Sequence, residues 1–319
     1  MKFKTLILLA GGLLAPAIAA AQSDYPTRTV TMIIPFSAGG SNDTIGRYLS
    51  ERLASEWDQT VVAENRPGAG AAVGANYVVQ SDPDGYTLMF VSGTLTTTGA
   101  TRKNLPFDPI EDLQPVGIGA IGKMIIVTGN RLPLPSLQAV ADTAKQETVF
   151  YGTTGIGSLT QFAAENFANV ADIQMEPVHY GGGTDALLDL AGGRLDIYTG
   201  SVTQVLSQIE AGNATPVAVS SKTRASVLPN VPTIGEAGFP GGETDVWWGV
   251  FAPAGTPDDI VQKINSDINK VMNSADGAAF LEKLGAEPAK MSVEEFTSHV
   301  HAELEKWTEI AGRLGLSVE

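Results

Sequence analysis

The stretch "PFSAGGSNDTIGRYL", residues 35–49, separates a strand-like run from a helix-like run. Before the glycines, residues 29–36 are β-branched and apolar, which predicts a buried strand. After them, Ile45 and Leu49 recur with helical spacing, which predicts a helix over residues 44–56. Glycines between a strand and a helix leave room for a ligand at the start of the helix.

The same alternation continues along the chain. Residues 60–63 and 86–92 are typical of strands, and residues 73–80 of a helix between them. A second set of alternating elements runs over residues 148–220, and an apolar strand candidate at 246–253 precedes two amphipathic helices. This order predicts an α/β protein with two lobes, each a doubly wound, mostly parallel sheet flanked by helices.

The chain is expected to cross between these lobes twice, near residues 117–126 and 240–247. Glycines mark both places, and two crossovers suit a hinge. The predicted division is a signal peptide at 1–21, lobe 1 at 22–123 and 246–319, and lobe 2 at 124–245.

The amino terminus "MKFKTLILLAGGLLAPAIAAAQ" has two lysines, a short apolar run and small residues before position 22, which predicts a cleaved secretory signal peptide. A membrane anchor is the alternative, but Pro16 and the glycines interrupt the apolar run. The chain has no cysteine, so the expected protein is free in the periplasm and not lipid-anchored. Without Lys2 and Lys4 it carries 18 basic and 35 acidic side chains, a net charge of −17 that argues against nucleic acid or anionic membranes as partners.

Several motifs of catalysis and cofactor binding are absent. The loop of residues 35–49 has neither a Gly-Lys-Ser/Thr nor a G-x-G-x-x-G, "GIGSLT" at 155–160 has Thr160 where the last glycine should be, and G-x-S-x-G does not occur in the chain. The chain has three histidines, of which His299 and His301 point to different sides of a predicted helix. We therefore expect no enzyme activity, no cofactor and no metal site.

Four loops rich in glycine, serine and threonine remain, at the carboxyl ends of predicted strands: 36–43, 92–98, 152–158 and 179–184. Ligands of open α/β sheets bind at that end. Backbone N–H groups at helix starts bind an anion there without lysine or arginine. For any single loop, ordinary turn and cap chemistry is the alternative.

Six segments occur in an order that resembles a known family: "YPTRTVTMIIPFSAGGSNDTIGRYLSERL", "VVAENRPGAG", "DPDGYTLMF", "LPFDPIEDLQPV", "RASVLPNVPTIGEAGFPG" and "WGVFAPAGTP". Across the mature chain they resemble the TctC/Bug family of periplasmic solute-binding proteins, which serve tripartite tricarboxylate transporters. The resemblance implies a monomeric periplasmic-binding-protein clamshell that closes on a small carboxylate. It implies a di- or tricarboxylate, an aromatic carboxylate or an acidic amino acid as ligand, and permease subunits as partners.

The resemblance also suggests the binding residues. In lobe 1 one carboxylate is expected on Phe36, Ser37, Ala38, Gly39, Gly40 and Ser41, with Thr94 from the second loop. In lobe 2 the candidates are Thr153, Thr154, Gly155, Ser158, His179, Tyr180, Asp196, Thr199 and Ser201. Asp43 is interpreted as a helix-start residue, and Arg47 as either a wall of the pocket or an ion-pair partner.

The sequence departs from the family pattern at "VHYGGG", residues 178–183, where many members have V-P-Y-K-G-G. His179 replaces the proline and Gly181 the lysine, which predicts a wider lobe-2 wall and a bulkier ligand. A common glycine is also replaced by Ala71. His179 is either a packing residue or a donor to the far carboxylate that makes binding depend on pH. Two other functions stay open: a receptor that presents its closed form to a sensor kinase, and a carboxylate-processing enzyme.

Overall fold

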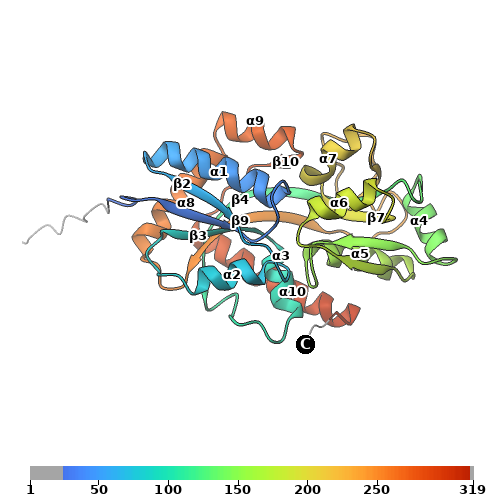
Figure 1. Ribbon diagram of the computed structural model, residues 1–319, viewed down its shortest axis with the longest axis horizontal. Coiled ribbons are helices and arrows are strands. Elements are labelled where there is room, and N and C mark those ends of the chain that lie inside the picture. The colour runs from blue at the N-terminus through green and yellow to red at the C-terminus, as the bar shows by residue number, and fades with distance from the viewer. Residues whose placement is uncertain (1–23, 317–319) are drawn as a thin grey trace, which may run out of the picture.

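The structure is a computed structural model that describes residues 24–316, so the predicted signal peptide lies outside the described residues. Its strands and helices alternate along the chain (Figure 1). The strands are β1 (Val30–Ile34), β2 (Val61–Asn65), β3 (Thr87–Ser92), β4 (Leu113–Thr128), β5 (Phe150–Thr153), β6 (Glu176–His179), β7 (Ile197–Ser201), β8 (Thr215–Val219), β9 (Asp245–Pro253) and β10 (Ala286–Glu287).

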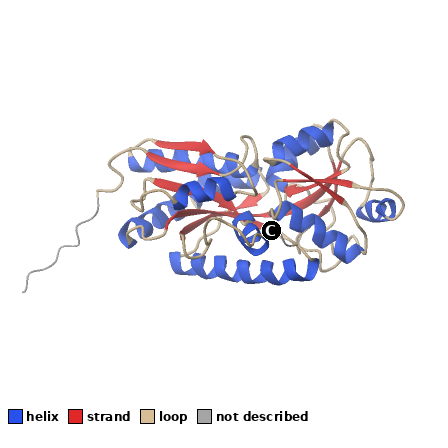
Figure 2. Cartoon of the chain, turned by 60° about the horizontal axis from the view of Figure 1, so that its bottom comes forward, coloured by secondary structure: helices blue, strands red, loops and turns tan. Residues whose placement is uncertain are grey.

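Helices cover both faces of the strands, as Figure 2 shows. They are α1 (Ser41–Trp57), α2 (Ala72–Val79), α3 (Thr94–Thr101), α4 (Leu137–Ala144), α5 (Leu159–Ala171), α6 (Gly183–Ala191), α7 (Val202–Glu210), α8 (Asp258–Met272), α9 (Ala275–Lys283) and α10 (Val293–Leu314). We call β1–β3, β9 and β10 with α1–α3 and α8–α10 lobe 1, and β5–β8 with α4–α7 lobe 2.

Each lobe contains three parallel strands. In lobe 1, β1 pairs in parallel with β2 and β3, and in lobe 2, β5 pairs in parallel with β6 and β7. The strand order β2-β1-β3-β9-β4-β7-β5-β6 joins both sets. The carboxyl ends of β1, β3, β5 and β7 therefore face the region between the lobes, which is where the loops of interest begin.

Strand β4 belongs to both lobes. It pairs antiparallel with β9 as far as Lys123, opposite Asp245, and antiparallel with β7 from Met124, opposite Ser201. The second connection between the lobes, at the start of β9, lies beside β4, because Asp245 is paired with Lys123. Just before it, Thr244 donates its backbone N–H to the carbonyl of Ser220 in lobe 2. The expected α/β fold is confirmed, with mixed pairing where β4 and β9 run between the lobes.

Two local expectations need correction. Residues 94–98 form the first turn and centre of α3, whereas the sequence suggested a loop over 92–98. The glycines of the first crossover are packing residues inside β4: a Cβ at Gly119 would lie 3.0 Å from the Phe90 ring, and one at Gly122 2.9 Å from the Trp248 ring. Large aromatic neighbours leave no room for a side chain at these two glycines.

The carboxyl-terminal helix joins the lobes from outside. Helix α10 begins with a capping box in which Ser292 and Glu295 exchange hydrogen bonds, as the sequence predicts. Its apolar stripe is buried, and Trp307 contacts Phe162 of α5 in lobe 2 with ring centroids 5.2 Å apart. Along residues 24–316, no helix is both long and apolar enough to cross a membrane.

Candidate functional site

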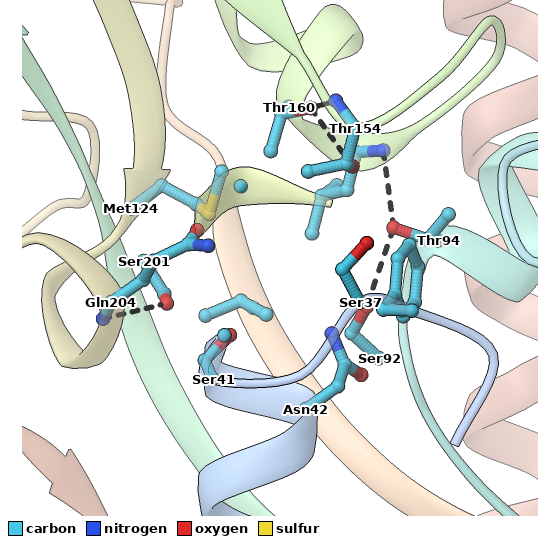
Figure 3. Close-up of a pocket in the computed structure, with 15 residues that line it drawn as sticks. Ser37, Ser41, Asn42, Ser92, Thr94, Met124, Thr154, Thr160, Ser201 and Gln204 are labelled. Atoms are coloured by element: carbon cyan, nitrogen blue, oxygen red, sulfur yellow. Dashed lines mark hydrogen bonds between the residues drawn. The ribbon is translucent and has the colours of Figure 1, made fainter. Parts of the chain in front are cut away.

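A small cavity lies where the two lobes meet, and Figure 3 shows its lining side chains. Most of the lining is uncharged and polar, and an apolar part is formed by Phe36, Met124, Leu159 and Val246. The full lining is Phe36, Ser37, Gly40, Ser41, Asn42, Ser92, Thr94, Met124, Thr154, Leu159, Thr160, Gly183, Ser201, Gln204 and Val246. Among these lining residues no side chain carries a formal charge.

Five helices of the described chain start at this cavity, because its lining includes the first residues or caps of α1, α3, α5, α6 and α7. The amino end of each helix carries a partial positive charge of about half an elementary charge. Three of the caps are Gly40, Gly93 and Gly182, which have no side chain to bond the first N–H groups. The arrangement therefore favours an anion without a lysine or arginine.

The lobe-1 loop is held in place by Asp43 from behind. Gly39 has φ of +82°, which turns its N–H toward Asp43 Oδ2 at 2.9 Å. Arg47 Nε and Asn65 Nδ2 both donate to Asp43 Oδ1 at 2.8 Å. Asn65 Nδ2 also donates to the carbonyl of Phe36 at 3.0 Å. This network fixes the loop, and it shows that Arg47 is an ion-pair partner and not part of the cavity wall.

The same network sets the charge of Asp43. Burial alone would raise the pKa of its carboxyl, but the hydrogen bonds from Arg47, Gly39 and Asn65 hold the pKa below its usual value of 3.8. The carboxylate is therefore ionised at neutral pH, and its two oxygens accept hydrogen bonds from three donors. Asp43 thus supports the loop without repelling an anion through free acceptor oxygens.

The first lobe-2 loop, residues 153–158, is held by hydroxyl groups. Thr160 Oγ1 accepts from the backbone N–H of Thr154 at 2.8 Å and lies 2.9 Å from Ser158 Oγ. Ser158 caps α5 by accepting from the N–H of Gln161. Leu159 donates its N–H across the cleft to Thr94 Oγ1 at 3.3 Å. This loop thereby connects α5 to α3.

The lobes are closed on each other in this structure. Thr184 Oγ1 donates to the carbonyl of Ala38 at 3.1 Å, and a Cβ at Gly182 would lie 2.8 Å from Ser37 Cβ. The remaining cavity is about 30 Å³, enough for the centres of one or two water molecules. A ligand with a carbon chain therefore requires the lobes to separate before it enters and to close around it less tightly than this.

The structure brings part of the predicted site together. The predicted residues that line the cavity are Phe36, Ser37, Gly40, Ser41, Thr94, Thr154 and Ser201. Ala38, Gly39, Thr153, Gly155 and Ser158 lie in the same loops but support the lining without forming it. Thr199 lies two residues before Ser201 in β7. It is fully buried, and its Oγ1 has no hydrogen-bond partner in the described structure.

Asp196 is not at the cavity. Arg131 forms two hydrogen bonds with its carboxylate, and the N–H of Phe150 donates to it at 2.8 Å. Asp196 precedes β7, whereas Ser201 ends it, so about 16 Å of strand separates the two residues. Its acidic side chain ties β5 to the segment before α4, and we remove it from the proposed site.

His179 and Tyr180 also lie outside the lining. His179 Nδ1 is 2.7 Å from Thr153 Oγ1, and Tyr180 donates its hydroxyl to Asp189 Oδ2 at 2.8 Å. His179 keeps an exposed edge, yet its buried part is desolvated enough to lower its pKa, so the ring is neutral at pH 7. In the closed structure Gly181 and Gly182, which follow it, lie against Ser37 of lobe 1.

Several lining residues were not among the candidates predicted from the sequence, above all Gln204, Met124, Val246 and Asn42. Met124 and Val246 lie on the strands that connect the lobes, and their apolar character predicts only burial. Asn42 and Gln204 follow the caps of α1 and α7 by two and three residues. The polar residues of a first helical turn that follows a strand end are the signal that could have found these two.

A cavity between two α/β lobes, formed by helix starts from both, defines the class of solute-binding receptors. Residues 45–316 match the family described as "Tripartite tricarboxylate transporter family receptor" (TctC), and the chain belongs to this family. The Bordetella pertussis protein BugT is 29% identical over 98% of this chain and 97% of its own.

Solved structures of the same family agree. A structure of an R. palustris protein with adipate has a TM-score of 0.89 and 33% identity, and the match covers 92% of this chain and 99% of that one. MatC from Rhodopseudomonas palustris with bound malate has a TM-score of 0.86 and 27% identity, over 90% and 99% of the two chains. The ligands in these two structures, adipate and malate, are both carboxylates.

Proposed function

We propose that this protein is a periplasmic receptor that captures a small carboxylate between its lobes and delivers it to the permease of a tripartite tricarboxylate-type transporter. One observation carries the proposal: five helix starts from both lobes meet at a cavity whose lining has no charged side chain. Their N–H groups and partial charges stabilise an anion, and no reactive pair or metal cluster is needed for that role.

The proposal includes how the ligand changes the protein. With lobe 1 at 22–123 and 246–319 and lobe 2 at 124–245, β4, β9 and α10 link the two lobes, and Gly285 lies against Val202 and Val227. A carboxylate on the lobe-1 loop adds partners to the helix starts of lobe 2, so it stabilises the closed form. A permease that recognises the closed form then takes up the ligand from loaded receptors. We propose that the receptor works as a monomer, without a cofactor, after its signal peptide is removed.

A thermal-shift screen of the mature chain tests the binding function. The panel contains adipate, malate, citrate, glutamate and benzoate, with adipamide and 1,6-hexanediol as uncharged controls. A ligand at one hundred times its dissociation constant adds about 2.7 kcal/mol to the free energy of unfolding. Stabilisation by at least one carboxylate and by neither control supports the proposal. A chain that no carboxylate stabilises, or that the controls stabilise equally, contradicts it.

Delivery needs a separate measurement. Deletion of the gene for this protein should abolish uptake of the acid identified in the screen, and the intact gene should restore it. Normal uptake in the deletion strain, together with loss of a transcriptional response to the acid, would instead favour the sensing role.

A further inference from the structure

Gln204 of α7 is placed at the boundary between the lobes. A Cβ built on Gly40, the cap of α1 in lobe 1, would lie 3.4 Å from Gln204 Nε2. The start of α6 is closer still, because a Cβ on Gly183 would lie 1.9 Å from the same atom. The amide nitrogen of Gln204 therefore faces the point where three helix starts meet, those of α1, α6 and α7.

Tyr198 fixes the direction of this amide. Tyr198 is buried, and its hydroxyl donates to Gln204 Oε1 at 2.8 Å. Burial raises the pKa of Tyr198, so the hydroxyl keeps its proton and remains a donor. With Oε1 occupied by Tyr198, the two N–H groups on Nε2 are presented to the cavity, and within residues 24–316 no protein atom accepts from them.

Two glycines make the space for this pair. A Cβ on Gly183 would also lie 2.3 Å from the Tyr198 hydroxyl, and one on Gly200 would lie 2.5 Å from the Tyr198 ring. A larger residue at either position would displace Tyr198 or Gln204. The pair therefore occupies a formed pocket with a fixed orientation, unlike a surface glutamine that samples many rotamers.

Resting on the function proposed above, we propose that Gln204 is the lobe-2 donor for the carboxylate seated at the start of α1, so that a single carboxylate bridges the two lobes. Lobe 1 supplies backbone N–H groups from the uncapped first turn of α1, and lobe 2 supplies Nε2. Because Gln204 is neutral, its amide donates to a carboxylate oxygen without adding a positive charge to the cavity. The remaining helix starts, α3 and α5, lie around Thr94 and Thr160 and are available to a second polar group of the ligand.

The apolar lining lies with Met124, Leu159 and Val246. A ligand that satisfies both sets of helix starts has two polar ends and an aliphatic middle. The preferred substrate class is therefore a linear dicarboxylate. A tricarboxylate brings a third negative charge to a cavity that offers it no cation.

The test compares Q204E with the wild-type chain by calorimetric titration of adipate and malate at pH 7.5. The substitution keeps the oxygen that accepts from Tyr198 but replaces the two donors with a negative oxygen. Loss of a hydrogen bond to a charged group corresponds to about 10- to 100-fold weaker binding. Q204M, which removes the donors without adding charge, is expected to weaken binding about tenfold.

The pH dependence separates direct contact from a structural defect. As the pH falls from 7.5 to 5.5, the introduced carboxyl takes up a proton and becomes a donor again. The ratio of the Q204E dissociation constant to the wild-type value should therefore fall, and Q204E should bind the acid with uptake of a proton. A variant that is only misfolded shows no such rescue.

Q208E is the matched control, because Gln208 lies one turn further along α7 and bonds Asn213. It should bind both acids as the wild-type chain does at both pH values. Wild-type binding with an unchanged Q204E overturns the inference and leaves the receptor function standing. Failure of the wild-type chain to bind any carboxylate of the screen overturns both.

Discussion

Lobe 1 and lobe 2 each contain one buried carboxylate on the elements that form the cleft, and the two differ in position. The Asp43 side chain is 8% exposed and holds the loop that lines the cavity. The Asp196 side chain is fully buried and pairs with Arg131 at the opposite end of β7. The lobe-1 carboxylate thus fixes a loop beside the cavity, whereas the lobe-2 carboxylate fixes the far end of β7.

This difference explains which half is preformed. A loop whose donors and acceptors are already satisfied from behind loses little conformational entropy when a ligand binds. In this closed structure the lobe-2 loops contact lobe 1 through Thr184, Gly182 and Leu159. We infer that lobe 1 binds first and that lobe 2 adds the contacts that select the closed form.

The largest expected effect on stability is that of Asp196→Asn. The substitution leaves Arg131 facing an amide and removes one acceptor from a fully buried site. We expect a loss of about 3 kcal/mol in the free energy of unfolding, and a ligand affinity within twofold of wild type. Urea unfolding and calorimetry measure the two quantities. If the affinity of the folded variant, corrected for its unfolded fraction, fell by more than twofold, Asp196 would belong to the site after all.

Asp43→Asn should change both quantities. One carboxylate oxygen becomes an NH₂ group that faces a donor, so we expect a loss of about 2 kcal/mol in the free energy of unfolding and at least tenfold weaker binding. Because the pKa of Asp43 is lowered in the folded state, its stabilisation is present at neutral pH and is lost as the pH falls below its usual value of 3.8. The stability difference between variant and wild type should therefore shrink between pH 7 and pH 3, and a constant difference would contradict this.

Gly182→Ala should affect closure and not folding. The Gly182 backbone is extended, with φ of −172°, which alanine adopts freely, but the new Cβ would lie 2.8 Å from Ser37 Cβ of lobe 1. We expect about tenfold weaker binding with unchanged unfolding of the unliganded chain. Gly181→Ala is the control, since its Cβ would meet Ser37 Oγ at an ordinary 3.5 Å. Equal affinities of the two variants would show that the closed contact is not formed in solution.

The smallest expected effect is that of His179→Ala on binding. The ring lies outside the cavity lining and is neutral at pH 7, so the ratio of affinities at pH 6 and pH 8 should match that of wild type. A histidine with a lowered pKa resists protonation in the folded state, so wild type loses part of its stability as the pH falls below about 6.5. The variant should lose less stability over that interval. A changed affinity ratio would restore His179 as a ligand donor.

Much of the fold could be predicted because it depends on local patterns. Alternating apolar runs and glycine-rich turns indicated the strand–helix order, and the capping box at Ser292 marked the start of α10. The 36–41 loop was predicted from its place after a strand. The start of α3 was missed because Gly93, Thr94 and Thr96 suit a loop as well as a helix start, and contact with α5 and α10 decides between them.

The sequence by itself determined the order of elements and the chemistry available at the strand ends, since both depend on neighbours along the chain. Only the tertiary structure decided which side chains line the cavity. Asp196 has the same composition signal as a ligand-binding acid, yet Arg131 holds it elsewhere. Gln204 has no sequence signature. Its amide faces the cavity because Tyr198 bonds Oε1 and because Gly183 and Gly200 leave space for this orientation. The direction of a side chain is set by contacts between segments far apart in sequence, and local patterns do not contain those contacts.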